Sequence, residues 1–214
     1  MTTLLLVGAT GLVGRSVLQQ ALLDARVRRI VAPARRPLPS DPKLDSPLVD
    51  FEQLNAGAPW WSADGVICTL GTTIRKAGSQ AAFRKVEYEY PLAVARLTRE
   101  HGARAFALTS AAGANPHSRL FYNRTKGEIE DAIRASGFPS LTIVRPALIG
   151  GNRAEFRTAE FVAMRVLRLI EPALPRRYRV VSNELIARTL LEAAIAAAPG
   201  EHIIESEAIV REPG

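Results

Sequence analysis

Near its start the chain reads Leu4-Leu5-Leu6-Val7-Gly8-Ala9-Thr10-Gly11-Leu12-Val13-Gly14. A run of consecutive apolar residues such as Leu4–Val7 is typical of a parallel strand that is buried on both faces. The glycines that follow have the spacing Gly-x-x-Gly-x-x-Gly. In a dinucleotide-binding turn, Gly8 allows the sharp exit from the strand, Gly11 lets a pyrophosphate approach the backbone, and Gly14 lets the next helix pack closely on the sheet.

The helix that follows this turn offers a phosphate site. Its first N–H groups are free and its N-terminus carries a partial positive charge, and the hydroxyl of Thr10 adds a donor. We therefore expect cofactor contacts at Gly8, Thr10, Gly11, Leu12, Val13 and Gly14. A tight strand-to-helix turn without a ligand is the alternative interpretation. The strand before the glycines and the helix after them favour binding, because the motif requires that context.

The size and composition of the chain limit its class. Its 214 residues, 47% of them hydrophobic, are enough for one domain with a sizeable core, so we expect residues 1–214 to form a single domain. No apolar run reaches the roughly 18 residues of a membrane span, and the N-terminus lacks the features of a signal peptide. Cys68 is the only cysteine and the histidines are scattered, which excludes an internal disulfide and argues against a metal site. These features predict a cytoplasmic protein without a metal.

The net charge of +7 raises the question of nucleic-acid binding. Most of the positive charge is arginine, and it is spread along the chain rather than gathered in one basic block. Aromatic residues make up only 6% of the chain, and they do not alternate with basic residues as a single-strand binder requires. We therefore expect no nucleic-acid partner and no membrane partner, and a small anionic ligand that uses a few of the arginines.

Strand-like and helix-like stretches alternate along the chain, which predicts an α/β protein with a Rossmann-type doubly wound parallel sheet. The expected strands after the first are 30–32, 47–49, 65–70, 105–108 and 141–144, and the expected helices between them include 80–101 and 120–136. After Pro146 the pattern changes to a helix over 155–170, a short strand over 179–181, a helix over 183–198 and a last strand over 202–205. Residues 146–200 are too few for a second domain, so we expect them to form a small substrate-side lobe.

Two arginines at the end of the second expected strand bear on the choice of cofactor. The segment Ile30–Arg36 contains no Asp or Glu that could bind both ribose hydroxyls of NAD. Arg35 can instead face a 2′-phosphate with its guanidinium fork, and Arg36 can add charge or stack on adenine. We therefore expect NADP rather than NAD, although two solvated arginines are the alternative.

Asp50 ends the third expected strand and has two interpretations. In this kind of fold it can hydrogen-bond the adenine amino group. Together with Gln53 it also resembles a capping box at a helix N-terminus.

Tyr122 and Lys126 are four residues apart on an expected helix and therefore lie on one face of it. A lysine cation near a phenol favours the phenolate, and the pair can pass a proton to or from a substrate oxygen. Lys126 can also bind the nicotinamide ribose. Ser110 lies just past the strand at 105–108, where ligands bind in such sheets, and can polarise the substrate oxygen. The alternative is a surface helix on which Tyr122 packs and Lys126 is solvated.

Taken in this order, the motifs resemble those of an atypical short-chain dehydrogenase/reductase over nearly the whole chain, from Leu4 to about Glu205. Within that superfamily the chain is similar to the Tat-interacting-protein branch of oxidoreductases. Arg145–Gly151 matches the superfamily, and the stretches that carry the similarity to this branch are Cys68–Thr73, Lys76–Gly78, Phe121–Tyr122 and Lys126–Glu130. The resemblance departs where many members have an asparagine, because Val86-Glu87 stands there, and where Leu70-Gly71-Thr72 replaces an Asn-Ala-Gly turn.

The resemblance implies an NADP-binding Rossmann fold with further cofactor contacts. It implies that Leu70, Gly71 and Thr72 lie near the cofactor ribose, and that the backbone at Pro146 and Leu148 lies near the nicotinamide amide. It also implies the catalytic roles given above for Ser110, Tyr122 and Lys126, with Tyr122 and Lys126 contacting the cofactor as well.

Two functions of different classes follow from these residues. The first is an NADP(H)-dependent oxidoreductase that acts on a small carbonyl or alcohol. The second is a catalytically weak NADP(H)-sensing regulator that acts through a protein partner or as a homodimer. Epimerase or dehydratase chemistry on a nucleotide sugar is a third interpretation, and the short C-terminal lobe argues against it.

Overall fold

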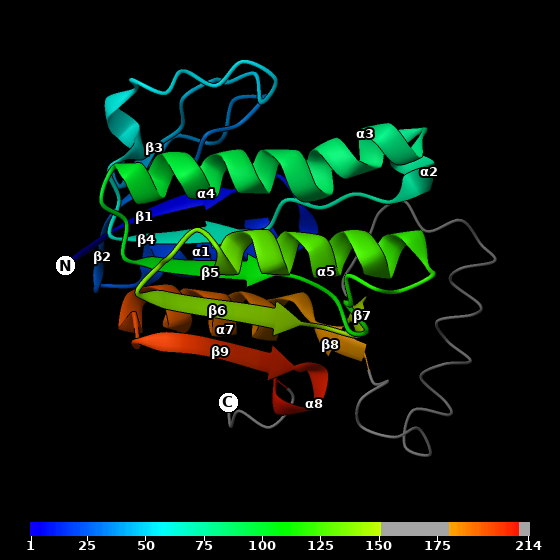
Figure 1. Ribbon diagram of the computed structural model, residues 1–214. Coiled ribbons are helices and arrows are strands. Elements are labelled where there is room, and N and C mark those ends of the chain that lie inside the picture. The colour runs from blue at the N-terminus through cyan, green and yellow to red at the C-terminus, as the bar shows by residue number, and fades with distance from the viewer. Residues whose placement is uncertain (151–179, 210–214) are drawn as a thin grey trace.

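The computed structural model describes residues 1–150 and 180–209, which contain a parallel sheet between two layers of helices (Figure 1). The order of the strands is β3-β2-β1-β4-β5-β6-β9, and every pairing is parallel. The strands are β1 (Thr2–Val7), β2 (Val27–Val31), β3 (Leu44–Asp45), β4 (Gly65–Cys68), β5 (Ala105–Thr109), β6 (Ser140–Arg145) and β9 (Gly200–Glu205). This order confirms the predicted Rossmann-type α/β fold.

Helices cover both faces of the sheet, as a doubly wound fold requires. In Figure 1, α4 (Tyr90–Glu100) and α5 (Phe121–Arg134) lie on one face, and α1 (Leu12–Leu23) and α7 (Asn183–Ala196) lie on the other. Short helices follow β4 and precede α4, namely α2 (Ile74–Ala77) and α3 (Gln80–Arg84), and a 3-10 turn η1 (Pro59–Trp61) precedes β4. The C-terminal ends of the strands all point to one edge of the sheet, and this edge carries the loops of interest.

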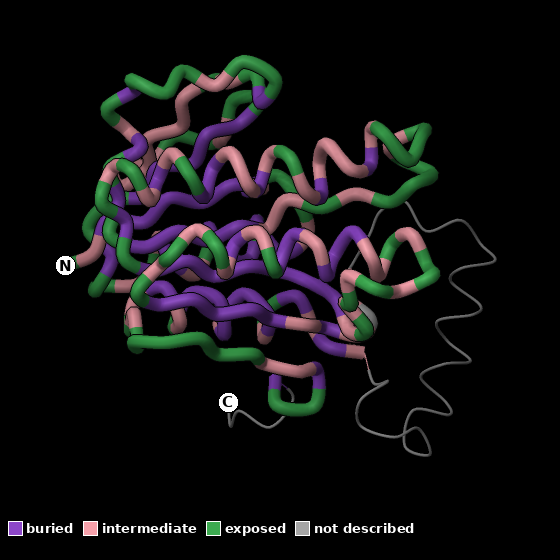
Figure 2. The backbone as a smooth tube through the Cα atoms, in the orientation of Figure 1, coloured by how far each residue is buried: buried purple, intermediate pink, exposed green. Residues whose placement is uncertain are grey.

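The apolar run at 4–7 is buried on both faces, as its composition predicts. Leu4 and Leu6 face the core beneath α1 and α7, whereas Leu5 and Val7 face the core beneath α4 and α5. This alternation follows from the two-residue period of a strand. Figure 2 shows the central strands buried along their length, while the edge strand β9 is largely exposed.

Two expected elements differ from the observed ones. The third strand is β3 at Leu44–Asp45 rather than 47–49, where a single bridge joins Leu48 to Ala34. Pro47 has no N–H to donate to a ladder, which explains why the strand does not continue there. The helix expected over 80–101 is broken by a π-helical turn, η2 (Lys85–Glu89), between α3 and α4. Pro91 cannot donate to the carbonyl four residues earlier, so regular α-helical bonding is interrupted at that point.

The part after β6 contributes to the main sheet as well as to a small separate one. Strands β7 (Leu148–Gly150) and β8 (Val180–Ser182) pair in a two-stranded parallel sheet. Helix α7 packs on α1 and the main sheet, and β9 pairs with β6 before α8 (Ser206–Ile209). The helix expected over 155–170 lies outside the described residues, so the lobe over 146–200 stays a prediction. No helix in the described ranges is both long and apolar enough to cross a membrane.

Candidate cofactor and active site

The glycine turn connects β1 to α1 at the C-terminal edge of the sheet. Gly8 has a φ of +90°, which favours glycine. A Cβ on Gly14 would lie 2.1 Å from the Gly8 carbonyl oxygen, so α1 can approach the strand this closely only with glycine there. Helix α1 begins at Leu12 with Gly11 as a cap residue that offers no side-chain hydrogen bond. Its N-terminus is therefore suited to an anion supplied by a ligand.

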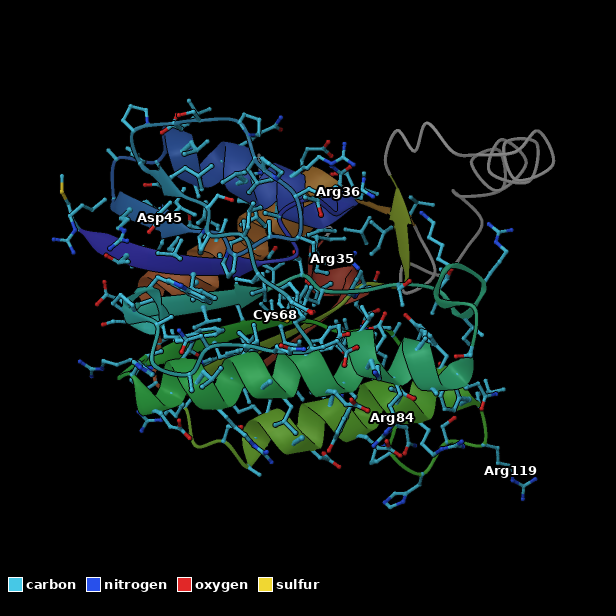
Figure 3. All side chains as sticks on the ribbon, turned by 90° about the horizontal axis from the view of Figure 1, so that it is seen from above. Arg35, Arg36, Asp45, Cys68, Arg84 and Arg119 are labelled. Carbon is cyan, nitrogen blue, oxygen red and sulfur yellow. The ribbon has the colours of Figure 1, made fainter. Side chains whose placement is uncertain are left out.

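An open cavity of about 1070 Å³ lies beside this turn and the segment that follows β2. Among the described residues its lining contains the cationic side chains of Arg15, Arg35, Arg36 and Lys76 and the acidic side chain of Asp41. Figure 3 shows Arg35 and Arg36 on the segment after β2. Apolar residues complete the wall: Leu18, Leu22, Leu38 and Leu44. We call this feature the cationic cavity; its mixture of cations and leucines suits a phosphorylated nucleoside.

Lys126 lies at the opposite end of the same edge, on α5, and is buried in an ion pair. Its Nζ atom is 2.6 Å from Oε2 of Glu87, and it donates over 3.4 Å to the carbonyl oxygen of Thr109 at the end of β5. The other oxygen of Glu87 accepts a 2.6 Å hydrogen bond from the Thr72 backbone N–H. Only 5% of Lys126 and 3% of Glu87 is exposed, which excludes the solvated lysine considered above.

The ion pair keeps Lys126 charged. Burial lowers the pKa of the Lys126 ammonium, but the charge of Glu87 and then that of a Tyr122 phenolate raise it, and the net pKa lies above the ordinary value. Tyr122 itself is 38% exposed, and its ring lies 5.8 Å from that of Phe83. A charged ammonium therefore lies one helical turn from an accessible phenol.

Ser110 is drawn into a different network. Its hydroxyl donates to Oε1 of Glu130 over 2.5 Å, and both residues are buried. Arg145 at the end of β6 binds both oxygens of Glu130 and also pairs with Glu205. The hydrogen bond to Glu130 raises the pKa of Arg145 above its usual range. The structure thus brings Lys126 and Tyr122 together, while the Ser110 hydroxyl is held by a buried carboxylate.

The other residues expected to contact the cofactor lie along the same edge of the sheet and differ in their exposure to solvent. Val13 packs in the core and Leu12 is half-buried. Gly71 is exposed, whereas Leu70 and Thr72 are half-buried. Pro146 is buried and its carbonyl oxygen accepts from the Ala112 N–H, and Leu148 begins β7.

Asp50 is exposed and accepts a hydrogen bond from the Glu52 N–H within a turn. No helix begins there in the described part of the chain, so the capping-box interpretation is wrong. Pro59, which starts η1 nine positions later, is where the next helical turn begins.

Three charged residues of these networks were not predicted from the sequence. Glu130 follows Lys126 by four residues, so helical spacing alone places it on the same face of α5. Arg15 directly follows Gly14 on the first turn of α1 and borders the cationic cavity. Glu87 stands where many members of the superfamily have an asparagine. The sequence alone does not show that Glu87 pairs with Lys126.

No family model matches the chain, but curated proteins do. The fmp52 protein of Aspergillus niger is 36% identical over 172 residues, which cover 76% of this chain and 73% of that protein. The fmp52 protein of Aspergillus clavatus is 32% identical and covers 98% and 94% of the two chains. Protein HTATIP2 of Rattus norvegicus is 29% identical over 96% of this chain and 86% of its own.

Solved structures with low sequence identity share the fold. MoeE5 in complex with UDP-glucose and NAD has a TM-score of 0.71 at 16% identity, over 94% of this chain and 74% of that one. WbmH of Bordetella bronchiseptica in complex with NAD⁺ has a TM-score of 0.70 at 15% identity, over 96% and 76%.

The relatives correct one prediction and confirm another. The expectation of a cytoplasmic protein is wrong, because the fmp52 relatives are named as mitochondrial proteins. The resemblance to the Tat-interacting-protein branch is confirmed by HTATIP2 and by the identity and coverage of the fmp52 proteins. The chain belongs to the family of the fmp52 proteins, whose resemblance to atypical short-chain dehydrogenases/reductases its motifs share.

Proposed function

We propose that this chain is an NADP(H)-dependent oxidoreductase that reduces a small carbonyl compound or oxidises the corresponding alcohol. The observation that carries the proposal is the cationic cavity beside the glycine turn. A 2′-phosphate adds negative charge to the adenosine end of the cofactor, and this cavity offers Arg35 and Arg36 at the end of β2, the position that distinguishes NADP from NAD in this fold. The fold neighbours MoeE5 and WbmH, whose complexes contain NAD, support a dinucleotide in general.

The residues of the turn fit a dinucleotide. The N-terminus of α1, with Gly11 and Thr10 before it, would hold the diphosphate, and Arg35 would face the 2′-phosphate. Gly71 is exposed and free of a side chain, so the backbone after β4 is open to a ribose. When bound, the nicotinamide supplies or accepts the hydride.

The proton chemistry belongs to α5. Tyr122 is accessible, and its hydroxyl can give a proton to the substrate oxygen in reduction or take one in oxidation. The Lys126 ammonium, kept charged by Glu87, places a positive charge one helical turn from the phenol. Lys126 is buried, so its role is to orient this charge and hold the ribose rather than to exchange protons with water.

The test measures binding first and turnover second. NADPH and NADH are titrated while nicotinamide fluorescence is followed, and we expect saturable binding with a preference for NADPH. Aldehydes, ketones and quinones are then screened for NADPH consumption, and Tyr122→Phe should lower turnover by about 10²- to 10⁴-fold. Tyr88→Phe is the matched control, because Tyr88 on η2 packs against Arg84 of α3 and has no proposed role. Lack of NADPH binding by the wild type at high micromolar concentration rejects the proposal.

One observation favours a second function, a cofactor-sensing protein with little turnover. The hydroxyl of Ser110, which would polarise the substrate oxygen, donates to buried Glu130 instead. A site without that hydroxyl would bind the cofactor yet activate a carbonyl poorly. Tight NADPH binding together with no turnover on any carbonyl class, and no change on Tyr122→Phe, would favour this alternative over the oxidoreductase.

A further inference from the structure

Glu87 joins three segments that meet at the nicotinamide end of the proposed site. It lies in the π-helical turn η2, and one of its oxygens accepts from the Thr72 N–H in the loop after β4. The other lies 2.6 Å from Lys126 Nζ on α5. Through Lys126, the pair also reaches the Thr109 carbonyl oxygen at the end of β5. One carboxylate oxygen is thus hydrogen-bonded and the other is in ion-pair contact, and both partners border the ligand edge of the sheet.

The π-helical turn explains how Glu87 reaches the interior. A π turn widens the helix and changes the direction of the side chains within it, and such turns are frequent at functional sites. Within η2, Glu87 is the buried residue, whereas Glu89 two positions later is exposed. Pro91 interrupts regular α-helical hydrogen bonding beside this π turn. This turn directs the Glu87 carboxylate toward Lys126.

Burial makes the arrangement specific. A buried carboxylate or ammonium is strongly unfavourable without a partner. Glu87 and Lys126 are both almost fully buried, so each restricts where the other can go. The flexible side chain of Lys126 is thereby held with its ammonium between Glu87 and Thr109.

We propose that Glu87 is a positioning residue that fixes the Lys126 ammonium and the Thr72 backbone in one arrangement, so that the nicotinamide end of the site is formed before the cofactor binds. This inference rests on the proposed function, because it assigns Glu87 a role toward the same cofactor. A neutral amide here would accept from the Thr72 N–H but would give Lys126 no opposite charge. The carboxylate performs both tasks.

Within the described residues, the titratable groups that act on the Lys126 ammonium include Glu87 on η2, Tyr122 on α5 and Cys68 on β4. Glu87 is the nearest negative charge, so its removal should change the titration of Lys126 more than any other single substitution in this set. The chain has only four lysines, at positions 43, 76, 85 and 126, which makes their individual NMR signals tractable.

The experiment compares Glu87→Gln with wild type and with the control Glu89→Gln. Protein labelled with ¹³C at the lysine Cε is titrated with base, and the Lys126 signal is assigned with Lys126→Arg. In Glu87→Gln we expect the Lys126 titration to move to lower pH by about 1 to 3 units. We also expect NADPH affinity to fall about tenfold. Glu89→Gln should leave both unchanged, and Glu87→Asp, which keeps the charge, should restore the titration.

Each outcome has a defined meaning. A shifted titration with weakened NADPH binding supports the positioning role. A shifted titration with unchanged NADPH binding overturns it and leaves Glu87 as an ion-pair partner only. An unshifted titration overturns the pair itself. If Glu87→Gln does not fold, Glu87→Asp replaces it as the test. NADPH affinity and a Lys126 titration equal to those of the wild type then support the role of the charge. A Lys126 titration that moves to lower pH in Glu87→Asp overturns it. If the wild type binds no NADPH, the proposed function fails first, whatever the lysine signals show.

Discussion

Charges at the ligand edge of this sheet are arranged in two opposite ways. In the cationic cavity, Arg15, Arg35 and Arg36 are exposed and border open space. At the ends of β5 and β6, Lys126 and Arg145 are paired with buried carboxylates. Exposed cations contribute little to folding and are available to a ligand, whereas a buried cation is tied to the stability of the fold. Substitutions of the exposed arginines should therefore change ligand binding without changing stability. Substitutions of Lys126 or Arg145 should also change stability, which confounds an activity measurement.

The largest effect should come from breaking the buried network. Glu130→Ala removes the buried partner of Arg145, whose other pair in the described part of the chain is with half-exposed Glu205, and it removes the acceptor of Ser110. We expect the free energy of unfolding to fall by about 3–5 kcal/mol. The control Glu201→Ala removes an exposed carboxylate that also pairs with an arginine, and should cost about 1 kcal/mol or less. Urea denaturation measures both, and equal losses would show that burial is not what distinguishes the two pairs.

A smaller effect, confined to binding, should come from the cationic cavity. Arg35→Ala should weaken NADPH binding about tenfold, because a charged hydrogen bond to the 2′-phosphate is lost. NADH binding should stay the same, and the free energy of unfolding should change by less than about 0.5 kcal/mol. Arg119→Ala is the control, since Arg119 is exposed and lies far from Arg35 in Figure 3. Unchanged NADPH affinity in Arg35→Ala would remove Arg35 from the site.

Local pattern predicts the fold of this chain well. The apolar run before Gly8 defines the central strand, because a strand buried on both faces needs no polar alternation. The close contact between Gly14 and the Gly8 carbonyl was likewise predictable, since it is the known reason for that glycine. The hydrophobic pattern did not predict the position of β3 or the break before Pro91. Both depend on prolines, which have no backbone N–H to donate to a strand or helix hydrogen bond.

The candidate site is less predictable from sequence, and the reason is distance along the chain. The spacing of Tyr122 and Lys126 is local and could be read directly. The contact between Lys126 and Glu87 joins residues 39 positions apart and requires a π turn, which no periodicity indicates. The orientation of the Ser110 hydroxyl depends on a carboxylate twenty positions later. Whether these residues catalyse a reaction stays a prediction.

The buried Glu87–Lys126 pair predicts a gradual loss of stability in alkaline solution. The folded-state pKa of Lys126 is raised above its ordinary value of 10.5. The stabilisation is therefore complete below pH 10.5 and is lost as the pH rises through the folded-state pKa. Burial also raises the pKa of the Cys68 thiol to about 12, so wild type alone would mix two titrations.

A comparison with Lys126→Met isolates the contribution of the Lys126 ammonium, including its effect on the nearby Cys68 thiol. The free energy of unfolding of each is measured from neutral pH to about pH 11. The advantage of the wild type should be constant at neutral pH and should shrink at the alkaline end. An advantage that grows with pH would mean that Lys126 is held neutral in the fold, in conflict with its ion pair to Glu87.

The smallest effect should be that of salt, and it separates the two regions without any substitution. Raising the ionic strength shortens the Debye length from about 10 Å at 0.1 M to about 3 Å at 1 M, which screens exposed charges far more than buried ones. NADPH affinity should therefore fall by about two- to fivefold. The Lys126 titration should not move, because its partner Glu87 is buried with it. Fluorescence titration and lysine NMR in the same two buffers check both statements, and a salt-dependent Lys126 signal would show that water reaches the pair.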